Sequence, residues 1–94
     1  MWATIAERAA TRPEGSYTAK LLAGGVDAAG RKVTEEATEV LMAAKDDDAG
    51  STPERRAALA GEAADLVYHL LVLLAERDVA PSAVLAELRR RHAE

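Results

Sequence analysis

Cysteine and phenylalanine are both absent from this 94-residue chain, which has one tryptophan and two tyrosines. Without cysteine the chain can form neither a disulfide bond nor a thiolate metal site. The apolar residues make up 49% of the chain and are mostly alanine and leucine. Both are strong helix formers, whereas the β-branched and aromatic residues that favour strands are scarce. The composition therefore predicts an all-α protein.

A surplus of positive charge is also missing, since 16 acidic and 12 basic residues give a formal net charge of −4. No basic stripe dominates the chain, which argues against nucleic-acid binding. The longest apolar run, 70–75, is too short to cross a bilayer, and no signal-peptide pattern opens the sequence. We therefore expect a cytoplasmic protein that binds neither nucleic acid nor membranes.

Apolar residues recur at helical spacing in four or five segments, without the period-two pattern of strands. The first is expected at 2–11, ending at the turn 12–15, and a short second helix follows, capped by Ser16 or Thr18 and stopped at 24–25. Longer helices are expected at 28–45 and 53–77, separated by an acidic loop at 46–52, and a last helix at 81–91. We expect one domain over 1–94, folded as a bundle of four to five helices.

The two long segments each carry an apolar face that should point into the core. In the third segment its members are Val33, Ala37, Val40, Leu41 and Ala44, and in the fourth Leu59, Ala63, Leu66, Leu70, Leu73 and Leu74. Alanine buries little area, so such a core stabilises a single chain only weakly. We therefore expect a homodimer in which a second copy covers part of the apolar surface.

Carboxylates interrupt both long helices at a regular spacing. Glu62 and Asp65 lie three residues apart inside the most apolar segment, and Glu36 and Glu39 have the same spacing on the preceding helix. Residues three or four apart share one helix face, so each pair can reach a single ion. Glu35 lies about 100° around the helix from Glu36.

Each acidic pair alone would be typical of a solvated helix face. Because the two helices are joined by one loop and should pack antiparallel, their carboxylates would converge, and like charges repel unless a cation neutralises them. Oxygen ligands without cysteine suit a hard ion, so we expect Mg²⁺, with Mn²⁺ possible. The run 46–48 is expected to be simply solvated.

This arrangement resembles the all-α nucleoside-triphosphate pyrophosphohydrolases, or MazG-like enzymes. Within that superfamily it is most similar to the phosphoribosyl-ATP pyrophosphatases of histidine biosynthesis. The similarity covers nearly the whole chain. The segments that carry it are Ser16-Tyr17-Thr18 with Leu21-Leu22 and Gly24, the stretch Lys32 to Val40, Ala43-Ala44-Lys45, and the stretch Glu62 to Val72.

The resemblance implies hydrolysis of phosphoribosyl-ATP to phosphoribosyl-AMP and pyrophosphate, the second step of that pathway. It implies the metal ligands Glu36, Glu39, Glu62 and Asp65. Glu35 and Glu36 would be catalytic, with Glu35 orienting or deprotonating the attacking water or holding a second ion. The implied substrate-binding residues are Ser16, Thr18, Lys20, Lys32 and His69.

Two other functions also fit the residues. One is a MazG-like house-cleaning hydrolase acting on canonical or damaged nucleotides. The other is a non-catalytic helical dimer, which would bind metal structurally or serve as an interaction module. His69 itself is as readily a satisfied interior polar group as a phosphate ligand.

Overall fold

The computed structural model describes residues 1–11 and 15–92 and contains five helices and, within these residues, no strand. Their bounds are α1 Trp2–Thr11, α2 Tyr17–Ala23, α3 Gly25–Ala49, α4 Pro53–Glu76 and α5 Pro81–His92. The all-α prediction is confirmed. Of the predicted turn at 12–15, only Gly15 is described, with φ +81°, and 12–14 lie outside the described residues.

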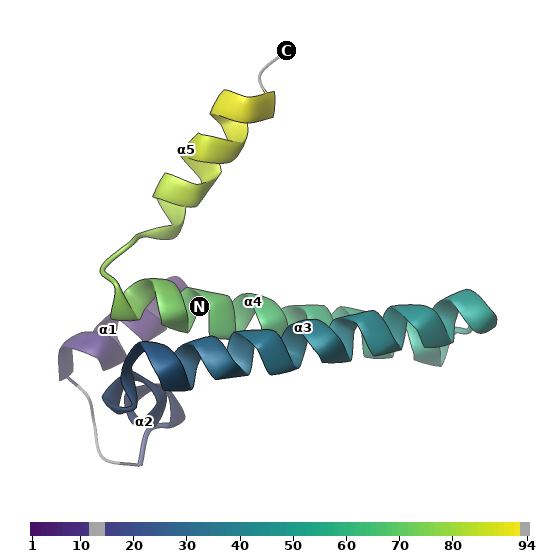
Figure 1. Cartoon of the computed structure of the whole chain (residues 1–94), viewed down its shortest axis with the longest axis horizontal. Helices are drawn as coiled ribbons and strands as arrows, with labels where there is room; N and C mark the ends of the chain where they lie inside the picture. The colour runs from purple at the N-terminus through teal and green to yellow at the C-terminus, as the bar shows by residue number, and fades with distance from the viewer. Residues whose placement is uncertain (12–14, 93–94) are drawn as a thin grey trace.

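The helices α3 and α4 form a long antiparallel hairpin that dominates the molecule (Figure 1). Thr52 begins α4: its hydroxyl oxygen accepts from the backbone N–H of Arg55, and Pro53 occupies the first helical position, where no N–H is needed. The sequence Ser51-Thr52-Pro53-Glu54 allows either Ser51 or Thr52 as the cap, and the structure uses Thr52.

The predicted loop at 46–52 is wrong for its first four residues, which continue α3 to Ala49. Aspartate costs roughly 0.7 kcal/mol or less relative to alanine in a helix, too little to end one that packs along a neighbour. Continuation also makes α3, at 25 residues, match the length of α4, at 24, to within one residue. The connection is then closed by Arg55 Nη1, which donates to the carbonyl of Gly50 at 2.6 Å.

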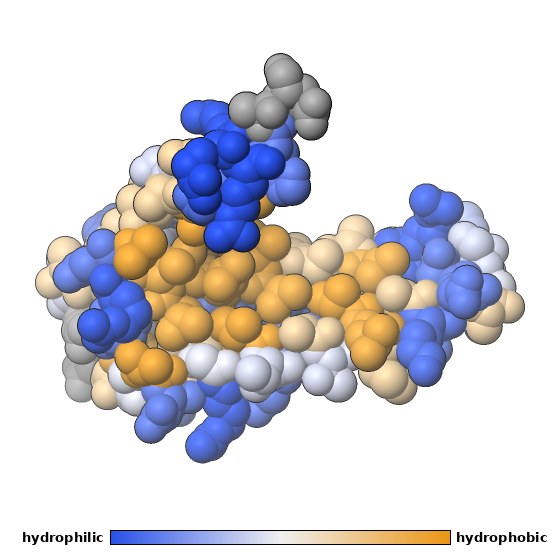
Figure 2. Space-filling view, turned by 45° about the horizontal axis from the view of Figure 1, so that its top comes forward, coloured by the Kyte–Doolittle hydropathy of each residue, from blue (hydrophilic) through white to orange (hydrophobic). Residues whose placement is uncertain are grey.

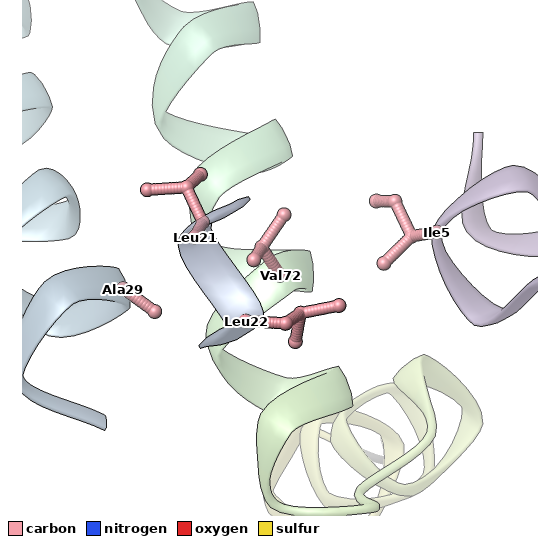
Figure 3. Packing of buried hydrophobic residues seen from close by; sticks show 5 residues of the cluster. All are labelled: Ile5, Leu21, Leu22, Ala29 and Val72. Atoms are coloured by element: carbon pink, nitrogen blue, oxygen red, sulfur yellow. The ribbon is translucent and has the colours of Figure 1, made fainter. Parts of the chain in front are cut away.

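The core lies at one end of the hairpin, where α1 and α2 pack against it. Five buried apolar side chains from four helices meet there (Figure 3): Ile5, Leu21, Leu22, Ala29 and Val72. A pair of glycines makes this packing possible between α2 and α3. A Cβ on Gly24 would lie 2.5 Å from the Cβ of Ala28, and Gly25 has φ +72°, a conformation that side chains disfavour.

The last helix, α5, projects away from the other four (Figure 1). The chain leaves α4 through Asp78, at φ 56°, and the N–H of Val79 bonds the carbonyl of Leu74, a helix-ending motif that normally uses glycine. None of the residues of α5 is buried.

Several residues predicted to face the core are exposed in the single chain. Leu41 is 59% exposed and Leu70 40%, and Ala37 is also exposed. The reason is that each long helix is covered by its hairpin partner on one side only. A broad apolar surface remains uncovered on the side from which α5 projects (Figure 2).

By length and composition, α4 is the one helix in the described part of the chain that could cross a membrane, although the 70–75 run alone is too short. Core helices of water-soluble proteins meet the same criterion. Two carboxylates, Glu62 and Asp65, lie near its midpoint, where a bilayer would make ionised groups most costly. This composition is therefore weak evidence for a membrane span.

Candidate active site

Three carboxylates from the two hairpin helices come together in the structure. Glu36 on α3 and Glu62 and Asp65 on α4 each place a ligand oxygen so that all three oxygens lie within 4.8 Å of one another. The three-residue spacing puts the α4 pair on one face, and the antiparallel packing turns that face toward α3. The donor set consists of oxygen atoms alone, which fits a hard divalent cation.

Negative charge is crowded in this cluster. The pKa of Glu62 is raised above its ordinary value, first by burial and then by the charges of Glu39, Asp65 and Glu36. Glu39 is not among the three residues whose oxygens converge, yet its charge acts on Glu62. A bound cation would relieve this repulsion, so the electrostatics agree with the donor set.

Lys32 supplies positive charge at the α3 side of the cluster. Its Nζ lies 3.3 Å from Glu35 Oε2 and 3.3 Å from Glu36 Oε1. Hydrogen bonds to these two carboxylates raise the pKa of Lys32, so its ammonium stays charged. The Glu36 side chain is 13% exposed and that of Glu35 is 50% exposed, so Glu35 is left open to solvent beside the cluster.

The substrate-binding residues predicted on α2 have different surroundings. Ser16 caps the helix: its Oγ accepts from the N–H of Ala19 at 3.2 Å and from Arg8 Nη1 at 3.3 Å. Lys20 is exposed. Thr18, by contrast, is buried, and its hydroxyl is hydrogen-bonded to the hydroxyl of Tyr68.

His69 is also buried, and both of its ring nitrogens have partners. Nε2 lies 2.8 Å from the hydroxyl of Tyr17, and Nδ1 lies 2.7 Å from the backbone carbonyl oxygen of Asp65. Neither nitrogen is left for a phosphate in this structure. Sequence reasoning did not select Tyr17, because the two residues of this pair are 52 positions apart and only the fold brings them together.

Comparison with known proteins identifies the family that this arrangement matches. The family model described as "Phosphoribosyl-ATP pyrophosphohydrolase" matches residues 1–92. The chain is 52% identical over 89 residues to the phosphoribosyl-ATP pyrophosphatase of Dinoroseobacter shibae, which is 95% of this chain and 80% of that protein.

Two other relatives are longer than the matched region. Similarity to the histidine biosynthesis bifunctional protein HisIE of Deinococcus radiodurans is 53% identity over 91 residues, 97% of this chain but 38% of that protein. Similarity to the phosphoribosyl-ATP pyrophosphatase of a Polaromonas species is 55% identity over 80 residues, covering 84% of this chain and 63% of that protein. The chain thus spans less than two thirds of either of these relatives.

Proposed function

This chain belongs to the phosphoribosyl-ATP pyrophosphohydrolase family, and on that premise we propose that it hydrolyses phosphoribosyl-ATP to phosphoribosyl-AMP and pyrophosphate. Water would hydrolyse the α–β phosphoanhydride bond, so that the α-phosphate stays on phosphoribosyl-AMP and pyrophosphate leaves. The convergence of Glu36, Glu62 and Asp65 within a chain of this family is the observation that carries the proposal.

We propose that these three carboxylates, with Glu39, hold Mg²⁺. Mn²⁺ is the alternative. When bound, such an ion neutralises charge on the phosphate oxygens of the substrate and aligns them for attack. The all-oxygen donor set and the raised pKa of Glu62 support this assignment.

The remaining residues would act around that ion. Glu35, open to solvent and next to Glu36, is placed to orient or deprotonate the attacking water. Glu35 is ion-paired with Lys32, whose ammonium would in turn meet phosphate oxygens. Exposed Lys20 on α2 and Ser16, which caps that helix, would bind the substrate.

We revise the proposed roles of Thr18 and His69. Both are buried and hydrogen-bonded within the chain, to Tyr68 for Thr18 and to Tyr17 and Asp65 for His69. Direct substrate contact would require these bonds to break. We therefore assign both residues to holding α2 in place.

We further propose that residues 1–94 form a single domain that works as a homodimer in the cytoplasm. Exposed apolar side chains on three helices support the dimer. They include Leu41 and Met42 on α3, Val67 and Leu70 on α4, and Val84, Leu85 and Leu88 on α5. On α4, the exposed residues Ala60, Ala64, Val67 and Leu70 follow one another at helical spacing, as in a helix–helix interface.

Pyrophosphate release from phosphoribosyl-ATP, measured with and without Mg²⁺, tests the proposed function. We expect release that depends on the metal, with a kcat/KM at least about tenfold higher than for any deoxynucleoside triphosphate in a matched panel, equivalent to about 1.4 kcal/mol of transition-state discrimination. Preference for the deoxynucleotides would instead favour a house-cleaning hydrolase. A metal-induced rise in melting temperature without pyrophosphate release would favour a structural metal site.

A further inference from the structure

Four side chains join the start of α2 to the middle of α4, and we call them the aromatic junction: Tyr17, Thr18, Tyr68 and His69. The rings of Tyr17 and Tyr68 are stacked, with centroids 6.3 Å apart and planes at 19°. The imidazole of His69 meets both rings edge-on, with its centroid 5.7 Å from that of Tyr17 and 5.0 Å from that of Tyr68. All four side chains are hydrogen-bonded: Tyr17 to His69, Thr18 to Tyr68, and His69 also to the backbone carbonyl of Asp65.

Hydrogen-bond chemistry assigns the protons in this junction. A backbone carbonyl only accepts, so the Nδ1 that faces the carbonyl of Asp65 must carry a hydrogen. In the neutral ring Nε2 is then an acceptor, and the hydroxyl of Tyr17 donates to it. Burial raises the pKa of Tyr17, which keeps that hydroxyl protonated.

The resulting chain of hydrogen bonds runs from Tyr17 through His69 to the backbone carbonyl of Asp65. Asp65 is also the residue whose side-chain carboxylate belongs to the converging cluster, so the chain ends on the backbone of a cluster residue. On its other side the hydroxyl of Tyr17 lies in the field of Lys32 and Glu36, both of which act on its pKa. Tyr17 is therefore bonded to α4 through His69 and interacts electrostatically with two charged residues of α3.

The start of α2 depends on this junction for its position. With seven residues, α2 is too short to be a stable helix alone. Its second half is anchored by Leu21 and Leu22 in the core, whereas its first turn has the cap Ser16 and the junction. Loss of the Tyr17–His69 bond would therefore loosen the first turn, which carries Ser16.

We propose that Tyr17 and His69 are positioning residues that hold the first turn of α2, with Ser16 and Lys20, at a fixed distance from the carboxylate cluster. This inference rests on the proposed function. His69 acts through Tyr17 and has no direct contact with phosphate. The aromatic junction thus sets how well the nucleotide is bound, while the ion is held by α3 and α4.

The substitution Tyr17→Phe tests this role because it removes one hydroxyl and keeps the ring. Loss of one hydrogen bond should raise KM for phosphoribosyl-ATP about fivefold to tenfold. The dissociation constant for Mn²⁺, measured by electron paramagnetic resonance without nucleotide, should stay that of the wild type. Hydrogen exchange at the amides of 17–23 should become faster, with little change in α3.

A double-mutant cycle with His69→Asn makes the test specific. Asparagine is shorter and has no acceptor at the position of the histidine Nε2, so each single variant should raise KM and the double variant should be no worse than either. Ile5→Val, a core substitution on α1, is the control for lost stability. It should lower the melting temperature and leave KM unchanged.

Two outcomes would overturn the positioning role while the proposed function stands: an unchanged KM in Tyr17→Phe despite a lower melting temperature, or fully additive effects in the cycle. A wild-type chain that releases no pyrophosphate from phosphoribosyl-ATP would instead overturn the proposed function, and the positioning role with it.

Discussion

Glu62, one of the proposed metal ligands, carries a charge that suits an ion site but is unfavourable for the fold. Its pKa is raised by burial and by three neighbouring carboxylates, so its ionised form is disfavoured in the folded chain. This destabilisation is fully present above the raised pKa and disappears as the pH falls below the ordinary value of 4.5. The charge therefore weakens the metal-free protein at neutral pH, which is the expected signature of a ligand retained for binding an ion.

The substitution Glu62→Gln should separate these two effects. At neutral pH without metal, its melting temperature should equal or exceed that of the wild type, because the repulsion is removed. At about pH 4, below the ordinary pKa of glutamate, this difference should vanish. With Mg²⁺ the wild type should gain thermal stability and the variant should gain little and lose turnover.

Calorimetry across this pH range, with and without Mg²⁺, measures all of these changes. Glu54→Gln, on the exposed first turn of α4, is the matched control and should keep both the metal-dependent stabilisation and turnover. Near-wild-type turnover of Glu62→Gln at saturating Mg²⁺ would contradict the ligand role.

At the scale of the element, the charges in the last turn of α3 are unfavourable for the end of a helix. Its last turn contains the acidic run 46–48 and no basic residue, although the carbonyl end of a helix favours positive charge. The helix persists there because it packs along α4 and because Gly50 and Arg55 close the connection. Packing and local capping together outweigh an unfavourable dipole.

Replacing Asp46 by lysine should therefore stabilise the protein. Reversing one exposed charge in the last turn of a helix should raise the free energy of unfolding by about 0.5–1 kcal/mol at low ionic strength. Denaturant unfolding at low and high salt measures the gain, which should shrink with salt. Asp46→Asn should give about half of it. No gain at low salt would mean that 46–49 behave as a solvated loop in solution.

At the scale of the whole molecule, the single chain is extended for its length. Its radius of gyration is 15.3 Å, whereas a compact domain of this size should have a radius of gyration of about 12 Å. The hairpin extends beyond the core, α5 projects from it, and an apolar surface lies between them (Figures 1 and 2). These features are those of half an assembly, in agreement with the proposed homodimer.

The substitution Val67→Glu tests the dimer. Val67 is 50% exposed on α4, and a buried glutamate at an interface would be strongly unfavourable. We expect the wild type to sediment at twice the chain mass and the variant to shift toward the single chain, with a lower melting temperature. Thr4→Glu, at an exposed polar position of α1, outside the three helices that carry the exposed apolar side chains, should keep the dimer. A wild type that sediments as one chain at every concentration would refute the proposal.

Much of the fold could be predicted from local features of the sequence. Helical periodicity located the five helices, and the bounds of α1 agree with the prediction. The cap of α4 was one of two candidates, both read from adjacent residues. These features were accessible because a helix depends on residues three or four positions apart.

The candidate site could be predicted only in part from local features of the sequence. Three-residue spacing predicted that Glu62 and Asp65 share a face, and the hairpin argument predicted that Glu36 would meet them. The position of Glu39 and the pairing of His69 with Tyr17 could not be predicted, because they depend on how separate helices are rotated against each other.

The sequence by itself thus determined the helices, their apolar faces and the acidic pairs, since all of these follow from local spacing and composition. Tertiary structure alone decided which carboxylates converge, that Thr18 and His69 lie inside the junction of α2 and α4, and that Leu41 and Leu70 remain uncovered. The physical reason is that burial and side-chain pairing are properties of packed neighbours. Periodicity shows which face of a helix is apolar, and only the packed chain shows what covers it.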